Sequence, residues 1–337
     1  MDLRDRLRLD VPVGQAGMGG GLAGAQLAAA VAAAGGLGTL GLVPPAELCQ
    51  SIGFIRDGAP GRAVAVNLLM PFVRRHHVEV CVESRIDVAV VAFGGDRALV
   101  QQLKDARIFV IAMVGSERRA REALHWGVDA LIAQGGEAGG HLCGEIPALE
   151  LLPNVLKICG GCPVLLAGGI ATAADTRSAL EAGASGVIAG TRFLLTHESG
   201  AHPEYQRRVL AADKTYRTTL FGLSWPAPHR VVANAATERW CHSDGTVKLV
   251  PRLINAPSGV IAKLPDRTIW SVPLPAPTPT AIGRLQTPRL PLFTPLAPMR
   301  GMPPSWVDRT ALYAGESALR MTEVISARQA LAELAGR

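Results

Sequence analysis

One stretch in the middle of the chain places a histidine directly after a glycine-rich turn. The apolar run 128–133 ends in Gln134, and the next seven residues contain four glycines, one carboxylate and His141. Glycines let a chain turn sharply and approach a ligand closely. Histidine changes its charge near neutral pH, and general acid/base catalysis needs such a group within reach of the substrate. We therefore predict that His141 is the catalytic residue.

Two later stretches repeat the pattern of an apolar run that ends in glycine. Gly168 and Gly169 follow one such run, and Gly190 and Thr191 follow another. Glycine-rich ends of strands that lead into helices bind anions through backbone N–H groups. Each pair alone could be an ordinary tight turn. Their occurrence together with the His141 stretch predicts a phosphate-bearing cofactor whose reactive end lies beneath His141.

Two further polar residues are candidates for roles at this site. Asn67 closes the alternating part, 62–67, of the predicted strand 62–69, where its amide could bond the edge of a cofactor ring or cap the turn, and we favour the first interpretation. Glu137 lies inside the glycine-rich stretch, and we expect its carboxylate to hold the loop by accepting backbone N–H groups. We do not expect Glu137 to be catalytic.

The six cysteines offer weaker candidates for chemistry. Cys159 and Cys162 form a C-x-x-C motif, which could be redox-active or half of a metal site, but the chain has no second such pair. We therefore favour a structural role and expect no bound metal. Cys143 lies near His141, but no other base is evident to activate it, so a covalent thiol mechanism is the less favoured interpretation.

Charge and composition narrow the class of protein. The net charge of +6 comes from arginines spread along the chain, and the local clusters 74–77 and 118–121 are not interleaved with aromatic residues. That pattern favours solvated helix faces over nucleic-acid binding. The charged N-terminus lacks the apolar segment of a signal peptide, and no apolar run reaches the ~20 residues that span a bilayer. With no disulfide-like cysteine spacing, we expect a cytoplasmic protein that does not bind membranes.

Apolar runs and helical segments alternate along the first two thirds of the chain. The runs are mostly solid rather than alternating, as in parallel strands buried on both faces. We predict eight strands, at 11–15, 37–42, 62–69, 87–93, 107–114, 128–134, 164–167 and 186–189. Eight such units close most naturally into a (β/α)₈ TIM barrel of α/β class. A doubly wound sheet fits less well, because no acidic residue ends the second strand.

The C-terminal part of the chain has a different amino-acid composition. Residues 242–304 hold 13 of the 24 prolines, so we expect an extended excursion with little regular structure. Its Trp270, Leu290, Phe293 and Trp306 predict that it packs on the barrel or on a neighbouring subunit. We expect helix to return at 317–335. The predicted domains are therefore a barrel over 1–240, the Pro-rich excursion over 241–310 and a C-terminal segment, 311–337, that returns to the barrel.

Several of these segments resemble one enzyme family. The matching segments are 15–18, 134–141, 167–170, 190–193, 229–234 and 313–317. They are similar to the FMN-dependent nitronate monooxygenases, formerly called 2-nitropropane dioxygenases, and the resemblance covers about 1–240 and 311–337. FMN-type enoyl-acyl carrier protein reductases and some NADH:quinone reductases share these motifs. The resemblance is thus more specific for the superfamily than for the reaction.

The resemblance implies a barrel with FMN lying across its strand ends. The family's flavin contacts correspond to Ala16, Gly17, Met18, Asn67, Gln134 and Gly139, and its phosphate contacts to Gly168, Gly169, Gly190 and Thr191. The family's catalytic histidine corresponds to His141. One departure concerns the first loop, where the family usually has proline at the position of Gly17.

The resemblance also implies a function. We expect oxidation of alkyl nitronates or nitroalkanes with O₂ to carbonyl compounds and nitrogen oxides, with FMN as cofactor. One alternative is an NAD(P)H-dependent FMN reductase of an enoyl thioester or quinone. A second, non-enzymatic alternative is an FMN-binding or partner-docking protein that works through its Pro-rich segment. The expected partners are a small-molecule substrate and O₂, and a homo-oligomer is compatible with the sequence.

Overall fold

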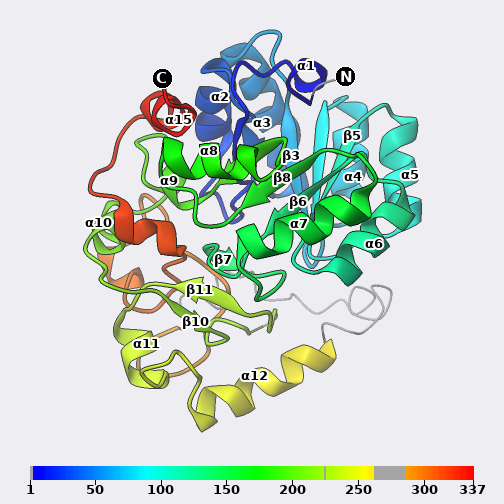
Figure 1. Cartoon of the computed structure of the whole chain (residues 1–337). Coiled ribbons are helices and arrows are strands. Elements are labelled where there is room, and N and C mark those ends of the chain that lie inside the picture. The colour runs from blue at the N-terminus through cyan, green and yellow to red at the C-terminus, as the bar shows by residue number, and fades with distance from the viewer. Residues whose placement is uncertain (1–2, 224, 262–285) are drawn as a thin grey trace. The chain divides into compact units, whose positions relative to one another are not determined.

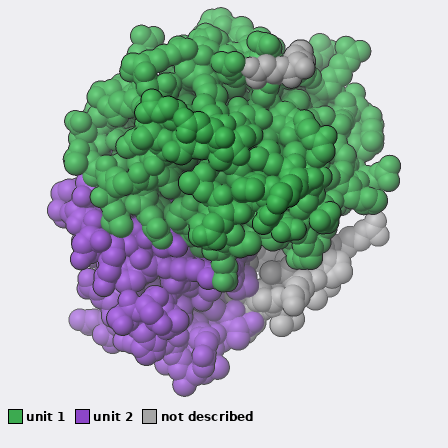
Figure 2. All heavy atoms as spheres, viewed as in Figure 1, with its two compact units in different colours: residues 1–138, 142–200, 315–337 green, residues 139–141, 201–314 purple. Residues whose placement is uncertain are grey.

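The computed structural model describes residues 3–223, 225–256 and 286–337 in full, and residues 257–261 by their backbone alone (Figure 1). By packing, the chain divides into two compact units, which Figure 2 colours separately. The first unit contains residues 1–138, 142–200 and 315–337, and the second contains 139–141 and 201–314. The two units meet in the chain at Gly200 and Gly315. The domain boundaries that we predicted from the sequence, at 240 and 310, remain predictions.

The first unit is built on eight parallel strands in the order β1-β9-β8-β6-β5-β4-β3-β2. The two ends of this order meet, because Gly14 bridges Leu37 and the Leu37 N–H donates to the Val13 carbonyl at 3.0 Å. The predicted (β/α)₈ barrel is therefore confirmed. The strands are β1 (Val13–Gln15), β2 (Thr39–Leu40), β3 (Ala65–Leu69), β4 (Val88–Ala92), β5 (Phe109–Val114), β6 (Ala130–Gln134), β8 (Val164–Ala167) and β9 (Gly186–Ala189).

Helices alternate with these strands and surround them (Figure 1). Asp96, Ser116 and Thr172 begin three of the helices, each accepting a backbone N–H from the first turn. The helices of this unit are α1 (Leu3–Leu7), α2 (Ala25–Ala33), α3 (Pro45–Gly58), α4 (Arg75–Glu83), α5 (Arg97–Asp105), α6 (Glu117–Trp126), α7 (Ala148–Cys159), α8 (Ala173–Glu181), α9 (Thr191–Leu194) and α15 (Ala327–Ala335), with the 3₁₀ turn η2 (Glu316–Arg320).

The barrel has two apolar layers. The side chains at alternate positions of the strands form one buried cluster inside the barrel, which includes Val90, Ile132 and Ile188. Leu3 and Leu7 of α1 belong to the same cluster. The other strand positions pack outward against the helices. Strands with both faces covered explain why the sequence shows solid apolar runs rather than alternation.

The second unit contains a small antiparallel sheet in the order β10-β11-β7. A buried apolar cluster that includes Phe221, Val231 and Phe293 packs within the same unit. Its elements are β7 (Gly140–His141), β10 (Tyr216–Thr218), β11 (His229–Val231), α10 (Pro203–Leu210), α11 (Ala235–Trp240), α12 (Leu249–Ile261) and the 3₁₀ turn η1 (Pro304–Trp306).

The Pro-rich region differs from expectation in its first part. Residues 249–261 form helix α12, so our expectation of little regular structure is wrong there. Phe293 is fully buried and Trp306 is buried, whereas Leu290 is exposed. Trp270 and the densest proline run, 273–279, lie outside the described residues. Packing of the whole excursion on the barrel or on a neighbouring subunit remains a prediction.

The C-terminal helix is also shorter than expected. We predicted helix over 317–335, but the structure has the 3₁₀ turn η2, an extended link over 321–326 and then α15. The Ser326 side chain accepts the Gln329 N–H and begins α15 at that point. In the described part of the chain, no helix is both long and apolar enough to span a bilayer.

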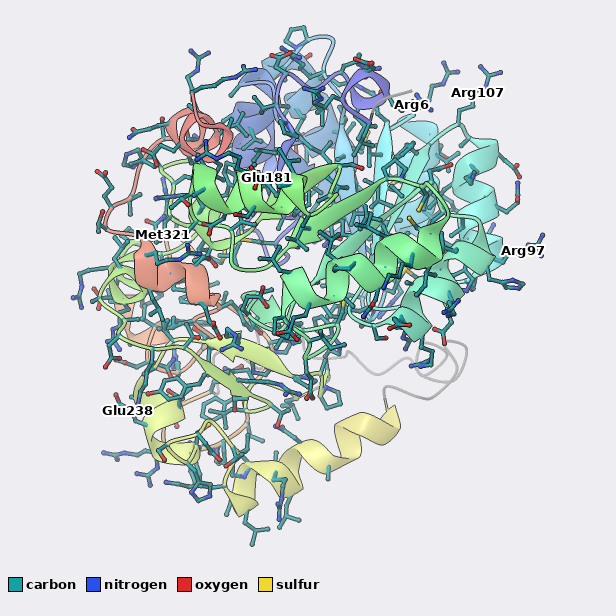
Figure 3. The ribbon with its side chains drawn as sticks, viewed as in Figure 1. Arg6, Arg97, Arg107, Glu181, Glu238 and Met321 are labelled. Carbon is teal, nitrogen blue, oxygen red and sulfur yellow. The ribbon has the colours of Figure 1, made fainter. Side chains whose placement is uncertain are left out.

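Several arginines of the first unit are exposed to solvent. Arg97 on α5 and Arg107 after it are exposed and point away from the barrel (Figure 3). Others are paired on their own helix, as Arg118 and Arg119 are with Glu122. The arginine cluster on α6 is therefore a solvated helix face with internal ion pairs.

Candidate active site

The predicted cofactor residues of the first unit lie at the carboxyl ends of the barrel strands, except Asn67, which is the middle residue of its strand. Ala16, Gly17 and Met18 follow β1, Asn67 is in β3, and Gln134 ends β6. The glycine pair 168–169 follows β8, and residues 190–191 follow β9. Because all eight strands are parallel, these ends open on one mouth of the barrel, which is where barrels of this kind carry their active sites. Gly139 belongs to the second unit.

The loop after β8 requires glycine at both predicted positions. Gly168 has φ of +116° and Gly169 has φ of +69°, in the left-handed region that other residues rarely adopt. A Cβ at Gly168 would lie 3.2 Å from the Glu137 carboxyl carbon, and one at Gly169 would lie 3.4 Å from the Glu137 Cγ, so both glycines make room for that side chain. A glycine-rich turn at a strand end also suits a phosphate, which is bound by backbone N–H groups rather than by side chains.

Gly190 faces open space. A Cβ built there would have one heavy atom within 4 Å, the Ala16 Cβ at 3.7 Å. Ala16 is itself a predicted flavin contact, so the loops after β1 and β9 border the same space. The space and the glycine backbone after β8 fit a phosphate-bearing cofactor.

The first loop is held by Asn67. Its Nδ2 donates to the Gly17 carbonyl at 2.6 Å, which joins β3 to the loop after β1 and is not the cap of its own turn that we considered. A Cβ at position 17 would lie 2.3 Å from the Asn67 Cβ. This close approach explains why glycine stands where the family usually has proline, since proline also carries a Cβ. A contact between Asn67 and a flavin remains a prediction.

The residues between β6 and α7 hold their loop by hydrogen bonds. The Gln134 Oε1 accepts the Cys143 N–H at 2.7 Å. The Glu137 carboxylate accepts the Ala148 N–H at the start of α7, at 3.0 and 3.2 Å. The expectation that Glu137 holds this loop through backbone N–H groups is confirmed.

Neither cysteine candidate has an activated thiol. Burial raises the pKa of Cys143 to about 12, so the thiolate needed for nucleophilic attack is scarce at neutral pH. Cys159 donates to the carbonyls of Leu156 and Cys162 at the end of α7, and burial raises the pKa of Cys162 to about 12. The described ranges hold no group of three or more potential metal ligands.

His141 belongs to the second unit by its packing. It forms the two-residue strand β7, in which His141 pairs with His229 of β11. Its imidazole stacks on Trp225, with ring centroids 3.5 Å apart and planes at 13°. His229 and Tyr313 lie at centroid distances of 5.0 and 5.4 Å. Strand pairing and these three rings fix the position of the imidazole within its unit.

This setting keeps both histidines neutral. Burial, and secondly the neighbouring His229, lower the pKa of His141 well below its usual value. Burial lowers the pKa of His229 to about 4. The His229 Nε2 accepts the Phe221 N–H at 3.3 Å, so its proton is on Nδ1, which donates to the Ala227 carbonyl at 3.0 Å. His141 therefore enters any reaction near neutral pH as an imidazole that can accept a proton.

Sequence reasoning missed the rings around His141. Trp225 was not singled out, and His229 and Tyr313 appeared only within segments that resemble the family. Two- and three-residue strands separated by nearly ninety positions leave no periodic signal, so the pairing of His141 with His229 could not be inferred from pattern.

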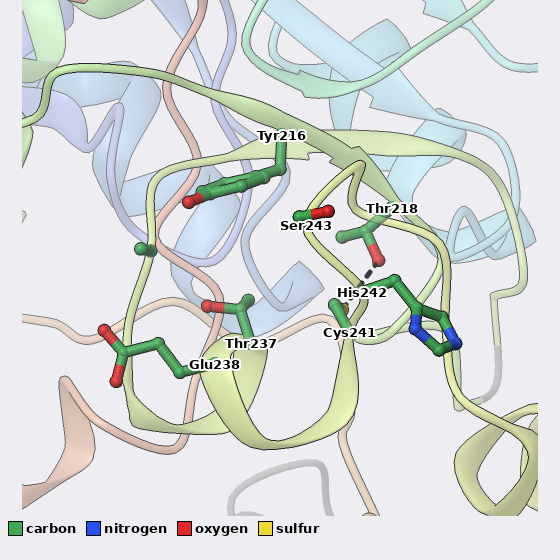
Figure 4. A pocket seen from close by; sticks show the side chains of 8 residues that line it. Tyr216, Thr218, Thr237, Glu238, Cys241, His242 and Ser243 are labelled. Atoms are coloured by element: carbon green, nitrogen blue, oxygen red, sulfur yellow. Dashed lines mark hydrogen bonds between the residues drawn. The ribbon is translucent and has the colours of Figure 1, made fainter.

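A small cavity in the second unit carries no comparable chemistry. It measures about 200 Å³ and is lined mainly by polar side chains of β10, α11 and the residues after α11 (Figure 4). The Thr218 hydroxyl lies 3.4 Å from the Cys241 sulfur, and Thr237 is used in capping α11 with Asn234. The cavity is below the usual size of small-molecule sites, and its threonines have structural roles.

The fold and the glycine-rich loops at its strand ends are those of a TIM-barrel enzyme with a candidate phosphate site. Comparison with known proteins identifies the family. The model of the nitronate monooxygenase family matches residues 54–336, and the chain belongs to this family. It is an enzyme of a family that acts on small molecules.

Three similar proteins show the range of that class. The (3aS,4S,5R,7aS)-5-hydroxy-7a-methyl-1-oxo-octahydro-1H-indene-4-carboxyl-CoA dehydrogenase of Mycobacterium tuberculosis is 37% identical over 70% of this chain and 67% of its own. A nitroalkane oxidase of Streptomyces ansochromogenes superposes with a TM-score of 0.74 at 26% identity, covering 99% of this chain and 96% of its own. FabK of Thermotoga maritima has a TM-score of 0.73 at 26% identity, with 98% and 94% covered.

Proposed function

We propose that the chain is an FMN-dependent enzyme that oxidises alkyl nitronates or nitroalkanes with O₂ to carbonyl compounds and nitrogen oxides. Family membership and the likeness to a nitroalkane oxidase support this proposal. The observation that carries it is the neutral imidazole of His141, fixed by strand pairing and by the Trp225 ring.

The flavin would be held by the loops at the strand ends of the first unit. Gly168, Gly169, Gly190 and Thr191 would bind the phosphate, and the loop after β1, with Asn67 and Gln134, would hold the remainder. Gly139, in the second unit, is the other predicted contact. When bound, FMN supplies the redox chemistry, taking electrons from the substrate and passing them to O₂.

His141 handles the proton. With a nitroalkane, its neutral imidazole would accept the proton from the carbon that bears the nitro group and so form the nitronate. With a preformed nitronate no proton has to move, and the imidazole would donate a hydrogen bond to the anion. An imidazole with a lowered pKa is a weak base, which matches an acidic C–H bond or an anionic substrate better than a weakly acidic one.

Replacement of His141 tests this role. His141→Ala should keep its FMN, because the imidazole contacts substrate and not phosphate, while turnover falls by roughly 10²–10⁴, the usual contribution of one general acid/base. His125→Ala, at an exposed position on α6, is the matched control and should leave turnover unchanged. A larger fall for nitroalkane than for nitronate assigns His141 as the base. Full activity of His141→Ala on both substrates would remove it from the mechanism.

A second candidate function is favoured by the 37% identity to a carboxyl-CoA dehydrogenase. In that case the substrate would be a CoA thioester, from which the enzyme removes a proton and a hydride equivalent. Reduction of an enoyl thioester by NAD(P)H is the same flavin chemistry in the opposite direction, and a quinone would accept electrons that NAD(P)H passes through the flavin.

Anaerobic mixing separates these candidates. The FMN-loaded protein is mixed in separate experiments with a nitronate, an acyl-CoA, NADH and NADPH, and bleaching of the flavin absorbance is recorded. We expect the nitronate to bleach it fastest. Rapid bleaching by acyl-CoA or by a nicotinamide, with no response to nitronate, would instead support the dehydrogenase or the reductase.

A further inference from the structure

We propose that Arg320 and Asp175 form a clamp that positions the phosphate loop after β8 and so lets the enzyme select FMN over riboflavin. This inference rests on the proposed flavin cofactor and adds two positioning residues to it. Neither residue contacts the cofactor in this proposal. Both act through the backbone of residues 168–172, in the first unit.

The segment that ends in Arg320 contacts three of the loops at the barrel mouth. The Gly315 N–H donates to the Thr191 Oγ1 at 3.0 Å, which ties the segment to the loop after β9. The Glu316 N–H donates to the Glu137 carbonyl at 3.0 Å, in the loop after β6. Arg320, at the end of the turn η2, reaches the loop after β8. The segment 315–320 therefore links the loops to which we assign the phosphate and its neighbourhood.

Arg320 makes a forked contact. Its Nη1 donates to the Asp175 Oδ1 at 2.8 Å and Oδ2 at 3.1 Å, and its Nη2 donates to the Gly169 carbonyl. Asp175 in turn accepts the Ala171 N–H at 2.9 Å and the Thr172 N–H at 2.8 Å. One ion pair thus holds both a carbonyl and two N–H groups of the same short loop. A planar guanidinium has the donor geometry for such a double contact, whereas an ammonium does not.

The clamp has a direct consequence for the N–H groups of the loop. Because the peptide unit is planar and trans, a Gly169 carbonyl fixed on Arg320 leaves the Ile170 N–H pointing the opposite way. The left-handed glycine pair would otherwise have many accessible conformations. Ordering the loop before the ligand arrives removes part of the entropy cost of binding. The guanidinium charge is balanced by the Asp175 carboxylate, so the clamp acts through the geometry of the loop and not through a net charge.

Flavin affinity of the apoprotein tests the clamp. We expect Arg320→Ala to weaken FMN binding at least about tenfold, the equivalent of ~1.4 kcal/mol and the lower range for a hydrogen bond to a charged group. Riboflavin, which lacks the phosphate, should lose less than about twofold. Binding is measured by the quenching of flavin fluorescence, and far-UV circular dichroism and a melting curve check folding.

Four further variants sharpen the test. Arg177→Ala removes the same charge from an exposed position on α8 and should leave the FMN to riboflavin ratio unchanged. Arg320→Lys keeps the positive charge but cannot make the two-armed contact of a guanidinium. Its FMN affinity should therefore lie between those of Arg320→Ala and the wild type. It replaces Arg320→Ala in the test if that variant does not fold. Asp175→Ala completes a double-mutant cycle with Arg320→Ala. The FMN affinity of the double variant should be little weaker than that of either single variant, because both residues act as a unit.

The outcomes separate the clamp from the cofactor assignment. A wild-type protein that binds neither flavin overturns the proposed function and the clamp together. If the wild type binds FMN, an unchanged affinity in Arg320→Ala overturns the clamp alone. An equal loss for FMN and riboflavin in Arg320→Ala and Arg320→Lys also overturns it, because the pair would then serve only general stability.

Discussion

At the scale of single residues, Gly190 gives the sharpest test of where the cofactor binds. Gly190→Leu should fill the open space beside Ala16 and expel FMN, so that the purified protein is colourless and cannot be reconstituted. Gly53→Leu is the matched control, because Gly53 lies in α3 and a Cβ there meets nothing within 4 Å. Absorbance at the flavin band, measured per chain, provides the comparison. FMN retained at one per chain in Gly190→Leu would place the phosphate elsewhere.

The sequence predicts the parts of the candidate site where only one type of residue can adopt the required backbone conformation. The left-handed backbone at Gly168 and Gly169 admits little else than glycine, so those positions stand out in the sequence. Arg320 and Asp175 do not stand out, because an ion pair between residues 145 positions apart leaves no local pattern. Trp225 was equally invisible, since stacking on His141 is a property of the folded unit.

At the scale of elements, the close contact between the β1 loop and β3 leads to a second prediction. Gly17→Ala should place its Cβ against Asn67 and cost about 1–3 kcal/mol in stability, the usual range for overpacking. The measurement is urea unfolding of the apoprotein. Asn67→Gly removes the opposing Cβ, so Gly17→Ala should cost clearly less in that background. An equal cost in both backgrounds would show that the clash with Asn67 is not the cause.

The elements themselves were predictable to different degrees. The strands at 164–167 and 186–189 have the predicted bounds, because a fully buried parallel strand is a short apolar run between turn residues. The predicted strand at 37–42 is only two residues long in the structure, β2. Helix α12 was missed because its Pro251 and Pro257 suggested an extended chain. Pro251 lies in the first turn, where the missing N–H costs little.

At the scale of the whole molecule, three histidines with lowered pKa values make stability depend on pH. Burial is the first cause for His77, His141 and His229. They stay neutral in the folded chain, whereas in the unfolded chain they take up protons below about pH 6.5. The unfolded state then binds more protons, so stability is full above about pH 6.5 and falls as the pH is lowered. For His229 the fall continues to its folded pKa of about 4.

The magnitude for His229 follows from its two pKa values. The pKa of His229 is about 2.5 lower in the folded chain than in the unfolded chain, which corresponds to roughly 3 kcal/mol of unfolding free energy. His229→Gln should therefore flatten the fall in unfolding free energy between pH 6.5 and 4.5, measured by urea unfolding at several pH values. His125→Ala, from an exposed position, should keep the wild-type slope. Carboxylates whose pKa is lowered, such as Glu204 beside Arg207, with a pKa of about 2, act mainly below this window. A slope in His229→Gln as steep as in the wild type would show that His229 is not a source of the acid sensitivity.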